Sequence, residues 1–145
     1  VAATYNHELV QHEDGVDAND LGTPTALAAY ISSSEFDIGD GNNFAYVWRM
    51  LPDLTFENSV STSTGTAPTV AMTLYPLQNS GSGTGTSVGA SVVKGSTYNI
   101  TEEYTGIVYT RVRGRQMIFK IASDQIGTTW QLGSPRLDLR PDGRR

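Results

Sequence analysis

The chain has 145 residues, enough for one ordinary domain that buries about two-thirds of its unfolded surface. It contains no cysteine, which excludes a disulfide framework and a thiolate metal site. No apolar run approaches the ~20 residues of a membrane span, and no signal-peptide pattern is present. Because the chain begins at Val1 rather than at a methionine, we expect a processed product or the end of a longer chain.

The formal net charge of −5 hides an asymmetry along the chain. Residues 1–73 hold ten acidic side chains and one basic side chain, Arg49. From Arg111 to Arg145, eight basic side chains stand against three acidic ones. Two interpretations follow. Either acidic loops lie near basic strands within the domain, or the acidic side of one subunit meets the basic side of its neighbour.

The first third of the chain predicts short strands separated by turns. Residues 1–20 are mixed and acidic, and we expect them to form an N-terminal extension. Leu27–Ile31 is either a short helical turn or the approach to a strand. Glu35–Ile38 alternates, with Phe36 and Ile38 on one face, and a Gly/Asp/Asn turn then reverses the chain.

Phe44–Leu51 predicts a strand with apolar residues on both sides, interrupted only by Arg49. A strand covered on both faces is expected at the centre of a sandwich or at a subunit contact. Pro52 ends this strand. Simple alternation separates two sets of residues on its opposite faces: Phe44, Tyr46, Trp48 and Met50 against Ala45, Val47 and Leu51.

Further strands are predicted after this point, with residues 79–87 as a flexible Gly/Ser/Thr loop inside the domain. Many short strands, frequent turns and no long helical period predict an all-β fold with minimal helix. We expect an antiparallel β-sandwich, of jelly-roll or Ig-like type, over residues 21–145. The later strands are expected at Thr69–Leu74, Ala90–Ile100 (a strand pair or an edge strand), Thr128–Leu132 and Arg136–Arg140.

The pattern around Gly114-Arg115 predicts a hairpin. Gly114 separates two runs rich in β-branched and aromatic residues, and a type II′ turn requires glycine at its first central position. One face of the hairpin is expected to be core and the other basic. The pairs expected on the core face are Val112–Met117, Thr110–Phe119 and Val108–Ile121. The outer face is expected to carry Ile107, Tyr109, Arg111 and Arg113 opposite Ala122, Lys120, Ile118 and Gln116.

Two patterns resemble metal sites but fit them poorly. His7 and His12 are five residues apart instead of the four of a zinc-protease helix, so they would lie about 140° apart around a helix with ~3.6 residues per turn. We interpret them as surface histidines. Asp37–Asn43 has oxygen ligands and glycines, but it lacks the order of a calcium loop and its distal glutamate. An acidic turn explains it better, and we predict no metal site.

Patterns for catalysis are equally weak. Asn99-Ile100-Thr101 is a glycosylation sequon, which has meaning only in a secreted eukaryotic chain. Glu102 and Glu103 are adjacent, so on a strand they would face apart and could not share acid/base work. The chain has no phosphate-binding loop and no Cys–His pair. We therefore predict a protein that is not an enzyme and uses no cofactor.

The basic residues of the last third are the best candidates for a functional surface. They form either a solvated strand face that discourages aggregation, or a face for phosphate or for an acidic protein surface. Because interface cores combine arginine with aromatic side chains, we favour a protein partner over nucleic acid. The predicted partner-interface residues are Tyr109, Arg111, Arg113, Arg115, Lys120, Arg136 and Arg140.

Three phrases of the chain resemble structural proteins of tailed bacteriophages. They are RVRGRQM at 111–117, Trp130-Gln131-Leu132-Gly133, and the ending RLDLRPDGRR. The resemblance covers most of residues 26–145. Within these proteins, the chain is most similar to the C-terminal region of the tail nozzle family of short-tailed phages, which is also described as tail tubular protein B or packaged-DNA stabilisation protein.

This resemblance implies a β-rich virion subunit in the phage tail. It also implies that residues 1–20 are the remnant of a preceding β-rich domain, as the alternative to an N-terminal extension. In that family the subunits form a hexameric ring around the channel that holds DNA, beside neighbouring tail or adaptor proteins. Contact with packaged DNA would be indirect, and no catalytic residue is implied. The alternatives are a capsid decoration protein or a receptor- or glycan-binding tail module, for which Tyr46, Trp48 and Tyr75 are candidate stacking residues.

Overall fold

The computed structural model describes residues 1–3, 7, 9–11, 15–20, 22–38, 41–60, 67–79, 81, 95–101 and 106–143. Apart from Asn79 and Gly81, the predicted loop 79–87 lies outside the described residues. Several other residues of the sequence analysis also lie outside them: His12, Gly39, Asp40, Ala90–Lys94, Glu102, Glu103, Arg144 and Arg145.

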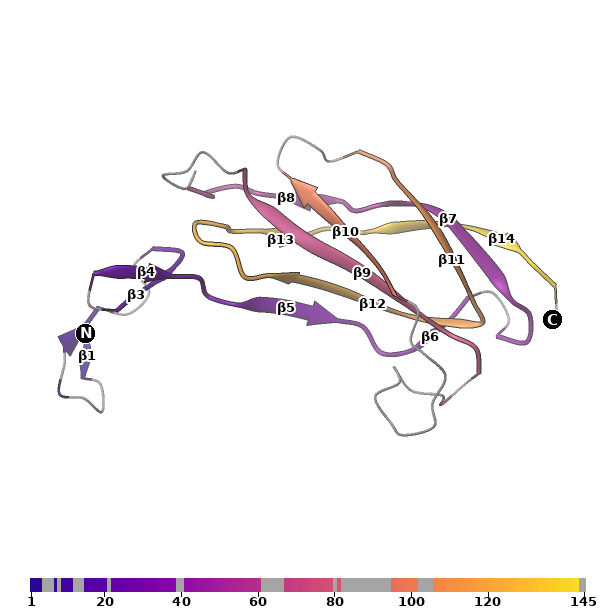
Figure 1. Ribbon diagram of the computed structural model, residues 1–145, viewed down its shortest axis with the longest axis horizontal. Coiled ribbons are helices and arrows are strands. Elements are labelled where there is room, and N and C mark those ends of the chain that lie inside the picture. Colours follow the sequence, from indigo (N-terminus) through magenta and orange to yellow (C-terminus); the bar gives the residue numbers. More distant parts are fainter. Residues whose placement is uncertain are drawn as a thin grey trace.

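The regular elements in the described part of the chain are all strands, which confirms the predicted all-β class (Figure 1). Six of them are longer than five residues, and one of these, β11, alternates strictly between buried and exposed positions. The strands are β1 (Ala2–Ala3), β2 (Leu9–Val10), β3 (Ala18–Asp20), β4 (Thr23–Thr25), β5 (Ala29–Ser32), β6 (Phe36–Asp37), β7 (Ala45–Leu51), β8 (Leu54–Thr55), β9 (Thr69–Leu77), β10 (Ser96–Thr101), β11 (Val108–Gly114), β12 (Gln116–Ser123), β13 (Gln131–Leu132) and β14 (Arg136–Pro141).

Two antiparallel sheets form a sandwich. The wide sheet has the order β10-β9-β12-β5, and β6 continues beside β12 beyond β5. The narrow sheet has the order β11-β7-β14. The pairs are nested along the chain, because β9 pairs with β10, β7 with β11, and the early β5 and β6 with the late β12. This nested order is the connectivity of a jelly roll, with β14 added at the edge of the narrow sheet.

The core lies between the inner faces of the two sheets. Its members come from both sheets and from the segments that join them, and most are less than 4 % exposed. Partly buried aromatic side chains, among them Trp130 and Phe119, pack against its margin. The buried cluster consists of Ile38, Ala45, Val47, Met50, Leu54, Phe56, Val70, Met72, Leu74, Ile100, Val108, Val112, Met117 and Ile121.

Strand β7 is the central strand of the narrow sheet, but its faces differ from simple alternation. Val47 and Met50 are both fully buried although they are three residues apart. The register with β11 and with β14 shifts at the intervening residues. This β-bulge turns Trp48 and Arg49 toward the same outer side, so the predicted grouping of Met50 with Trp48 is wrong.

The predicted hairpin at Gly114 is also wrong. Strands β11 and β12 do not pair with each other, because β11 pairs with β7 and β12 pairs with β9. The chain crosses from the narrow sheet to the wide sheet at Arg115, whose backbone N–H donates to the Leu77 carbonyl at 2.9 Å. Gly114 lacks the positive φ of a type II′ turn. A Cβ at this glycine would lie 2.9 Å from the Gln116 carbonyl oxygen, so close backbone approach is what requires glycine here.

The faces predicted for the same segment are correct. Val108, Val112, Met117 and Ile121 are all buried, although they meet from opposite sheets. Arg111 is exposed, as the outer position required. Side chains alternate between inward and outward positions along each strand, whether the two strands form a hairpin or belong to facing sheets. The alternation in the sequence is therefore compatible with both arrangements.

Thr110, on the inner face of β11, is 3 % exposed, and its hydroxyl oxygen has no hydrogen-bond partner in the described structure. We expect Thr110→Val, which keeps the shape, to raise the free energy of unfolding by about 1 kcal/mol because it removes an unsatisfied buried polar group. Urea denaturation should show a higher midpoint with an unchanged slope. Thr73→Val is the matched control, since the buried Thr73 hydroxyl does bond, to the Thr97 hydroxyl at 3.0 Å. Equal gains from both variants would contradict this account.

Two small hairpins, β1–β2 and β3–β4, precede the sandwich and project beyond its left-hand end in Figure 1. Asp17 anchors them to the sandwich: both oxygens of its carboxylate accept from the Gly127 backbone N–H at 2.8 Å. Two of their large apolar side chains are not buried, since Val1 is 93 % and Leu9 is 81 % exposed. The segment predicted as either a helical turn or a strand approach forms the edge strand β5.

Candidate functional site

The outer face of the narrow sheet combines arginine and aromatic side chains. In β11 the residues alternate strictly between buried and exposed, and in β14 the arginines pair beside outward residues of β7. The bulge in β7 adds two neighbouring side chains to this side. We call this surface the arginine–aromatic face; it consists of Phe44, Tyr46, Trp48, Arg49, Tyr109, Arg111, Arg113, Arg136, Asp138, Arg140 and Asp142.

Trp48 lies on the central strand of the arginine–aromatic face, in contact with two guanidinium groups. The Cζ atom of Arg49 lies 4.5 Å from the centroid of a Trp48 ring, and that of Arg140 lies 4.8 Å from it. The ring of Tyr109, which is 67 % exposed, is tilted beside it with a centroid distance of 6.4 Å. Such cation–π contacts contribute about 0.5–1 kcal/mol each at exposed sites, which favours an ordered side chain at Trp48.

Phe44 forms a second centre of the same kind at one end of the face. The guanidinium of Arg113 lies 3.9 Å from its ring centroid, and that of Arg115 lies 4.7 Å from it. Arg113 also pairs with the carboxylate of Asp142. Backbone hydrogen bonds between Phe44 and residues 142 and 143 hold the end of β14 against this ring. The arginines are therefore positioned by the sheet and by aromatic rings together.

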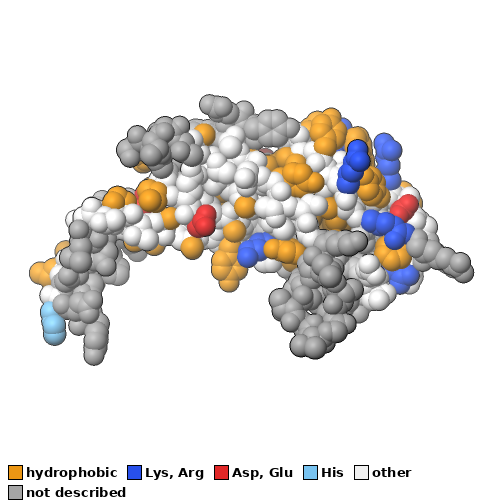
Figure 2. Space-filling model, in the orientation of Figure 1, with side chains coloured by type: hydrophobic (Ala, Val, Ile, Leu, Met, Phe, Trp, Pro, Cys, Tyr) orange, Lys and Arg blue, Asp and Glu red, His pale blue; other side chains and the backbone are white. Residues whose placement is uncertain are grey.

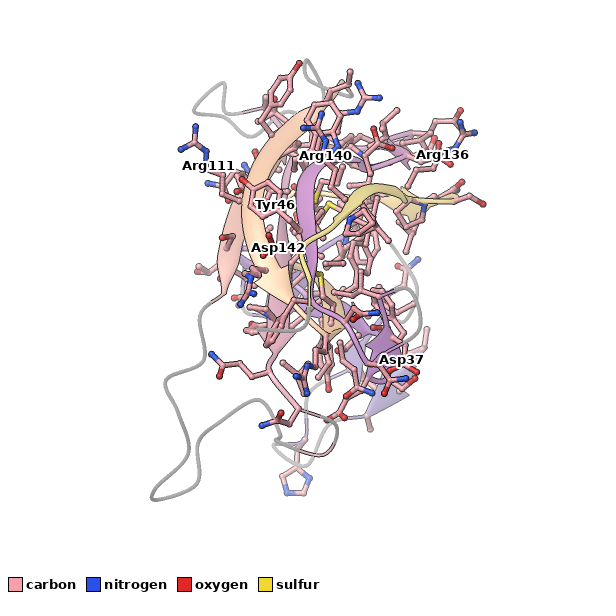
Figure 3. All side chains as sticks on the ribbon, turned by 90° about the vertical axis from the view of Figure 1, so that its right-hand side faces the viewer. Asp37, Tyr46, Arg111, Arg136, Arg140 and Asp142 are labelled. Carbon is pink, nitrogen blue, oxygen red and sulfur yellow. The ribbon has the colours of Figure 1, made fainter. Side chains whose placement is uncertain are left out.

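Five arginines against two aspartates leave the arginine–aromatic face positive. Arg49 pairs with Asp138, and both side chains are about one-third exposed (34 % and 33 %). An ion pair at this exposure contributes less than about 1 kcal/mol to stability, so we assign it an orienting role. Figure 2 shows Lys and Arg side chains gathered with hydrophobic ones at the right-hand end of the molecule. In Figure 3, Tyr46, Arg111 and Arg140 lie over the narrow sheet, away from Asp37 on β6.

The structure brings together five of the seven residues predicted to form an interface, and it places Arg115 at the corner beside them. Lys120 lies elsewhere. It is an outward residue of β12 in the wide sheet, and its ammonium lies 5.2 Å from the Tyr30 ring centroid. The predicted common face of Lys120 and Tyr109 is therefore wrong, because the two strands belong to different sheets. The five residues that share the face are Tyr109, Arg111, Arg113, Arg136 and Arg140.

The three candidate stacking residues also do not converge. Tyr46 and Trp48 lie on the arginine–aromatic face, whereas Tyr75 lies on β9 opposite Ile118, in the other sheet. The described residues thus offer no single groove lined by all three side chains.

The remaining chemical candidates have ordinary structural explanations. His7 lies in the N-terminal segment, and Asp37 accepts a hydrogen bond from the Gln116 side chain at 2.7 Å. No group of three metal-ligating side chains occurs in the part of the chain that the structure describes. Asn99 of the sequon is exposed on the edge strand β10. None of the described elements is a helix of the length and apolarity that a bilayer span requires.

Sequence reasoning missed four members of the arginine–aromatic face. Arg49 was interpreted as an interruption of an apolar strand. In the structure, Arg49 and Trp48 are neighbours that both point outward, because the strand has a β-bulge there. Asp138 and Asp142 were counted as acids without their partners. Phe44 was placed in the strand without its guanidinium contacts. The alternation of Arg136, Asp138 and Arg140 was the one signal that could have indicated a charged strand face.

Comparison with protein-family models, with curated proteins and with solved structures gives no match to this chain.

Proposed function

We propose that this chain is a structural component of a tailed-phage virion, and that it assembles into a ring in the tail through its arginine–aromatic face. The partners are other copies of the chain, in a hexamer if it follows the family that it resembles, together with neighbouring tail or adaptor proteins. Contact with packaged DNA is indirect. The proposal assigns no catalytic residue and no cofactor.

The observation that carries the assembly role is the composition of the arginine–aromatic face. Trp, Tyr and Arg are the side chains most enriched among residues that dominate binding energy at protein interfaces. Here Trp48 and Phe44 each lie in cation–π contact with two guanidiniums, so the side chains are positioned before a partner binds. Prior ordering lowers the entropic cost of association. The sequence resemblance adds the virion context.

A receptor- or glycan-binding tail module is the second candidate, favoured by the exposure of Tyr109. Guanidiniums over the Trp48 ring weigh against it, because a sugar would have to displace them in order to stack there. Binding of the isolated monomer to a glycan array would support this candidate over assembly.

The proposed function is tested by charge reversal at Arg111, which is exposed and central in β11. We expect the wild-type chain to form closed rings in electron micrographs, and Arg111→Glu to remain folded but monomeric because like charges then oppose across the interface. Arg113 is less suitable because it already pairs with Asp142. Lys120→Glu on the wide sheet is the control and should assemble normally. Normal rings from Arg111→Glu would count against the proposal.

A further inference from the structure

The two sheets differ in width, and this leaves one side of the sandwich open. The wide sheet is four strands across and the narrow sheet three. Near β10 and β11 the two sheets meet. Opposite β5 and β6, however, the narrow sheet ends at β14, which pairs with β7 and with no other described strand. The sandwich thus lacks one strand beside β14.

An apolar cleft of about 370 Å³ lies at this open side. Its lining comes from both sheets, and Leu139, on the inner side of β14, is 43 % exposed. Ile31 of β5 is directly opposite the fully buried Ile121 and so shares its face, yet it is 49 % exposed. Core-facing side chains are therefore uncovered along this side. The cleft is lined by Ser33, Phe36, Phe119, Pro135, Leu137 and Leu139.

The chemistry of the cleft and of its free edge specifies an added strand. Such a strand lies ~4.8 Å from its neighbour, bonds to the free backbone groups of the edge, and places alternate side chains inward. Its inward side chains must be apolar to fill the cleft. Its outward side chains would lie beside Arg136 and Arg140, which are exposed on the outer side of β14, so acidic or neutral polar residues fit there.

The N-terminal segment 1–11 of the chain meets both conditions at most of its positions. Its odd positions are apolar except for His7 and Gln11, and its even positions are polar except for Ala2 and Val10. The segment carries one acidic side chain, Glu8, and no Lys or Arg.

The same segment lacks a core of its own. Val1 and Leu9 are 93 % and 81 % exposed, and β1 pairs with β2 through two residues on each side. A two-stranded hairpin alone is marginally stable in water, so its opening costs little. Binding of the segment in an apolar cleft would therefore bury apolar side chains that are otherwise exposed to water.

We propose that segment 1–11 of one copy binds as an added strand along β14 of a second copy, with Val1, Ala3, Tyr5 and Leu9 on the side of the apolar cleft. A second copy fits better than the same chain, because Asp17 anchors the segment at Gly127 and both hairpins then project away from the sandwich (Figure 1). The inference rests on the proposed assembly of copies, but it uses the apolar cleft and the free edge of β14, which adjoin the arginine–aromatic face only at Arg136 and Arg140.

Cysteine crosslinking tests this directly, because the natural chain contains no cysteine. Full-length Leu9→Cys is mixed with full-length Leu139→Cys of different mass and treated with a short bis-maleimide. We expect a mixed dimer on a denaturing gel. The matched control pairs Leu9→Cys with Val60→Cys, since Val60 is an exposed apolar residue (61 %) outside the cleft. No mixed dimer, or equal yields from both pairs, would overturn the proposal.

Two further measurements separate the possible outcomes. A Leu9→Cys/Leu139→Cys double variant that crosslinks only within one chain would show that the cleft is filled in cis, which overturns the proposal. The mixed pair is also prepared with Trp48→Ala, where we expect the crosslink to persist although ring assembly is lost. If rings form but the crosslink does not, the added strand is contradicted and the proposed function is not. If the crosslink forms but the wild-type chain makes no rings, the proposed function is contradicted and the added strand is not.

Discussion

Replacing Ile121 with alanine should lower the free energy of unfolding by about 2 to 5 kcal/mol. Ile121 is fully buried and lies on β12, which is held between β9 and β5 in the wide sheet. The substitution removes apolar contacts and leaves a cavity that strands paired on both sides cannot close. Small domains are stable by about 5–15 kcal/mol, so this single change removes a large share of the total.

Equilibrium urea unfolding, followed by tryptophan fluorescence, measures this effect. Trp130 packs against the core and should report the loss of tertiary packing. Ile126→Ala is the matched control, because Ile126 is 40 % exposed in the turn that follows β12. We expect it to cost less than about 1 kcal/mol. Similar losses for the two variants would contradict the placement of β12 in the middle of the core.

Replacing Trp48 with alanine should weaken ring assembly by about 2–4 kcal/mol per contact, or roughly 30- to 1,000-fold in dissociation constant. Trp48 orders Arg49 and Arg140 through their cation–π contacts, so its removal frees both guanidiniums as well as deleting the ring. Central aromatic side chains surrounded by other contacts are where interface energy concentrates. Mass photometry across a dilution series measures the change.

Two further variants test whether the loss of assembly comes from unfolding and whether the interface lies on the narrow sheet. Tyr109→Ala removes a neighbouring, more exposed ring of the same face and should also weaken assembly while leaving thermal unfolding unchanged. Tyr30→Ala removes an aromatic ring that is 72 % exposed on β5, in the other sheet, and should leave assembly intact. A stronger effect at Tyr30 than at Trp48 would move the interface to the wide sheet.

The alternation of residues predicted which side chains are buried better than which strands are neighbours. Val108, Val112, Met117 and Ile121 were all placed correctly on the core side. Their strands were nevertheless assigned to one hairpin, because periodicity describes the two faces of a strand and not its partner. The corner at Gly114 depends on its approach to Leu77, a residue distant in sequence. No local pattern contains that information.

The arginine–aromatic face was predicted in part for the same reason. Positions on β11 and β14 followed from alternation, whereas Lys120 was placed with them only through the mistaken hairpin. Trp48 and Arg49 share a side because of a bulge, which breaks the period of two. Contacts such as Arg113 over Phe44 join residues far apart in sequence, so they require the folded sheet.

The nested pairing of strands has a consequence for synthesis on the ribosome. β5 and β6 emerge early, but their partner β12 begins only at Gln116. At ~5–20 residues per second, roughly four to sixteen seconds separate the two. During that interval β9 and β10 can pair locally, while the apolar sides of β7 and β6 stay uncovered in the nascent chain. We therefore expect the growing polypeptide to be a chaperone client until β12 has left the exit tunnel.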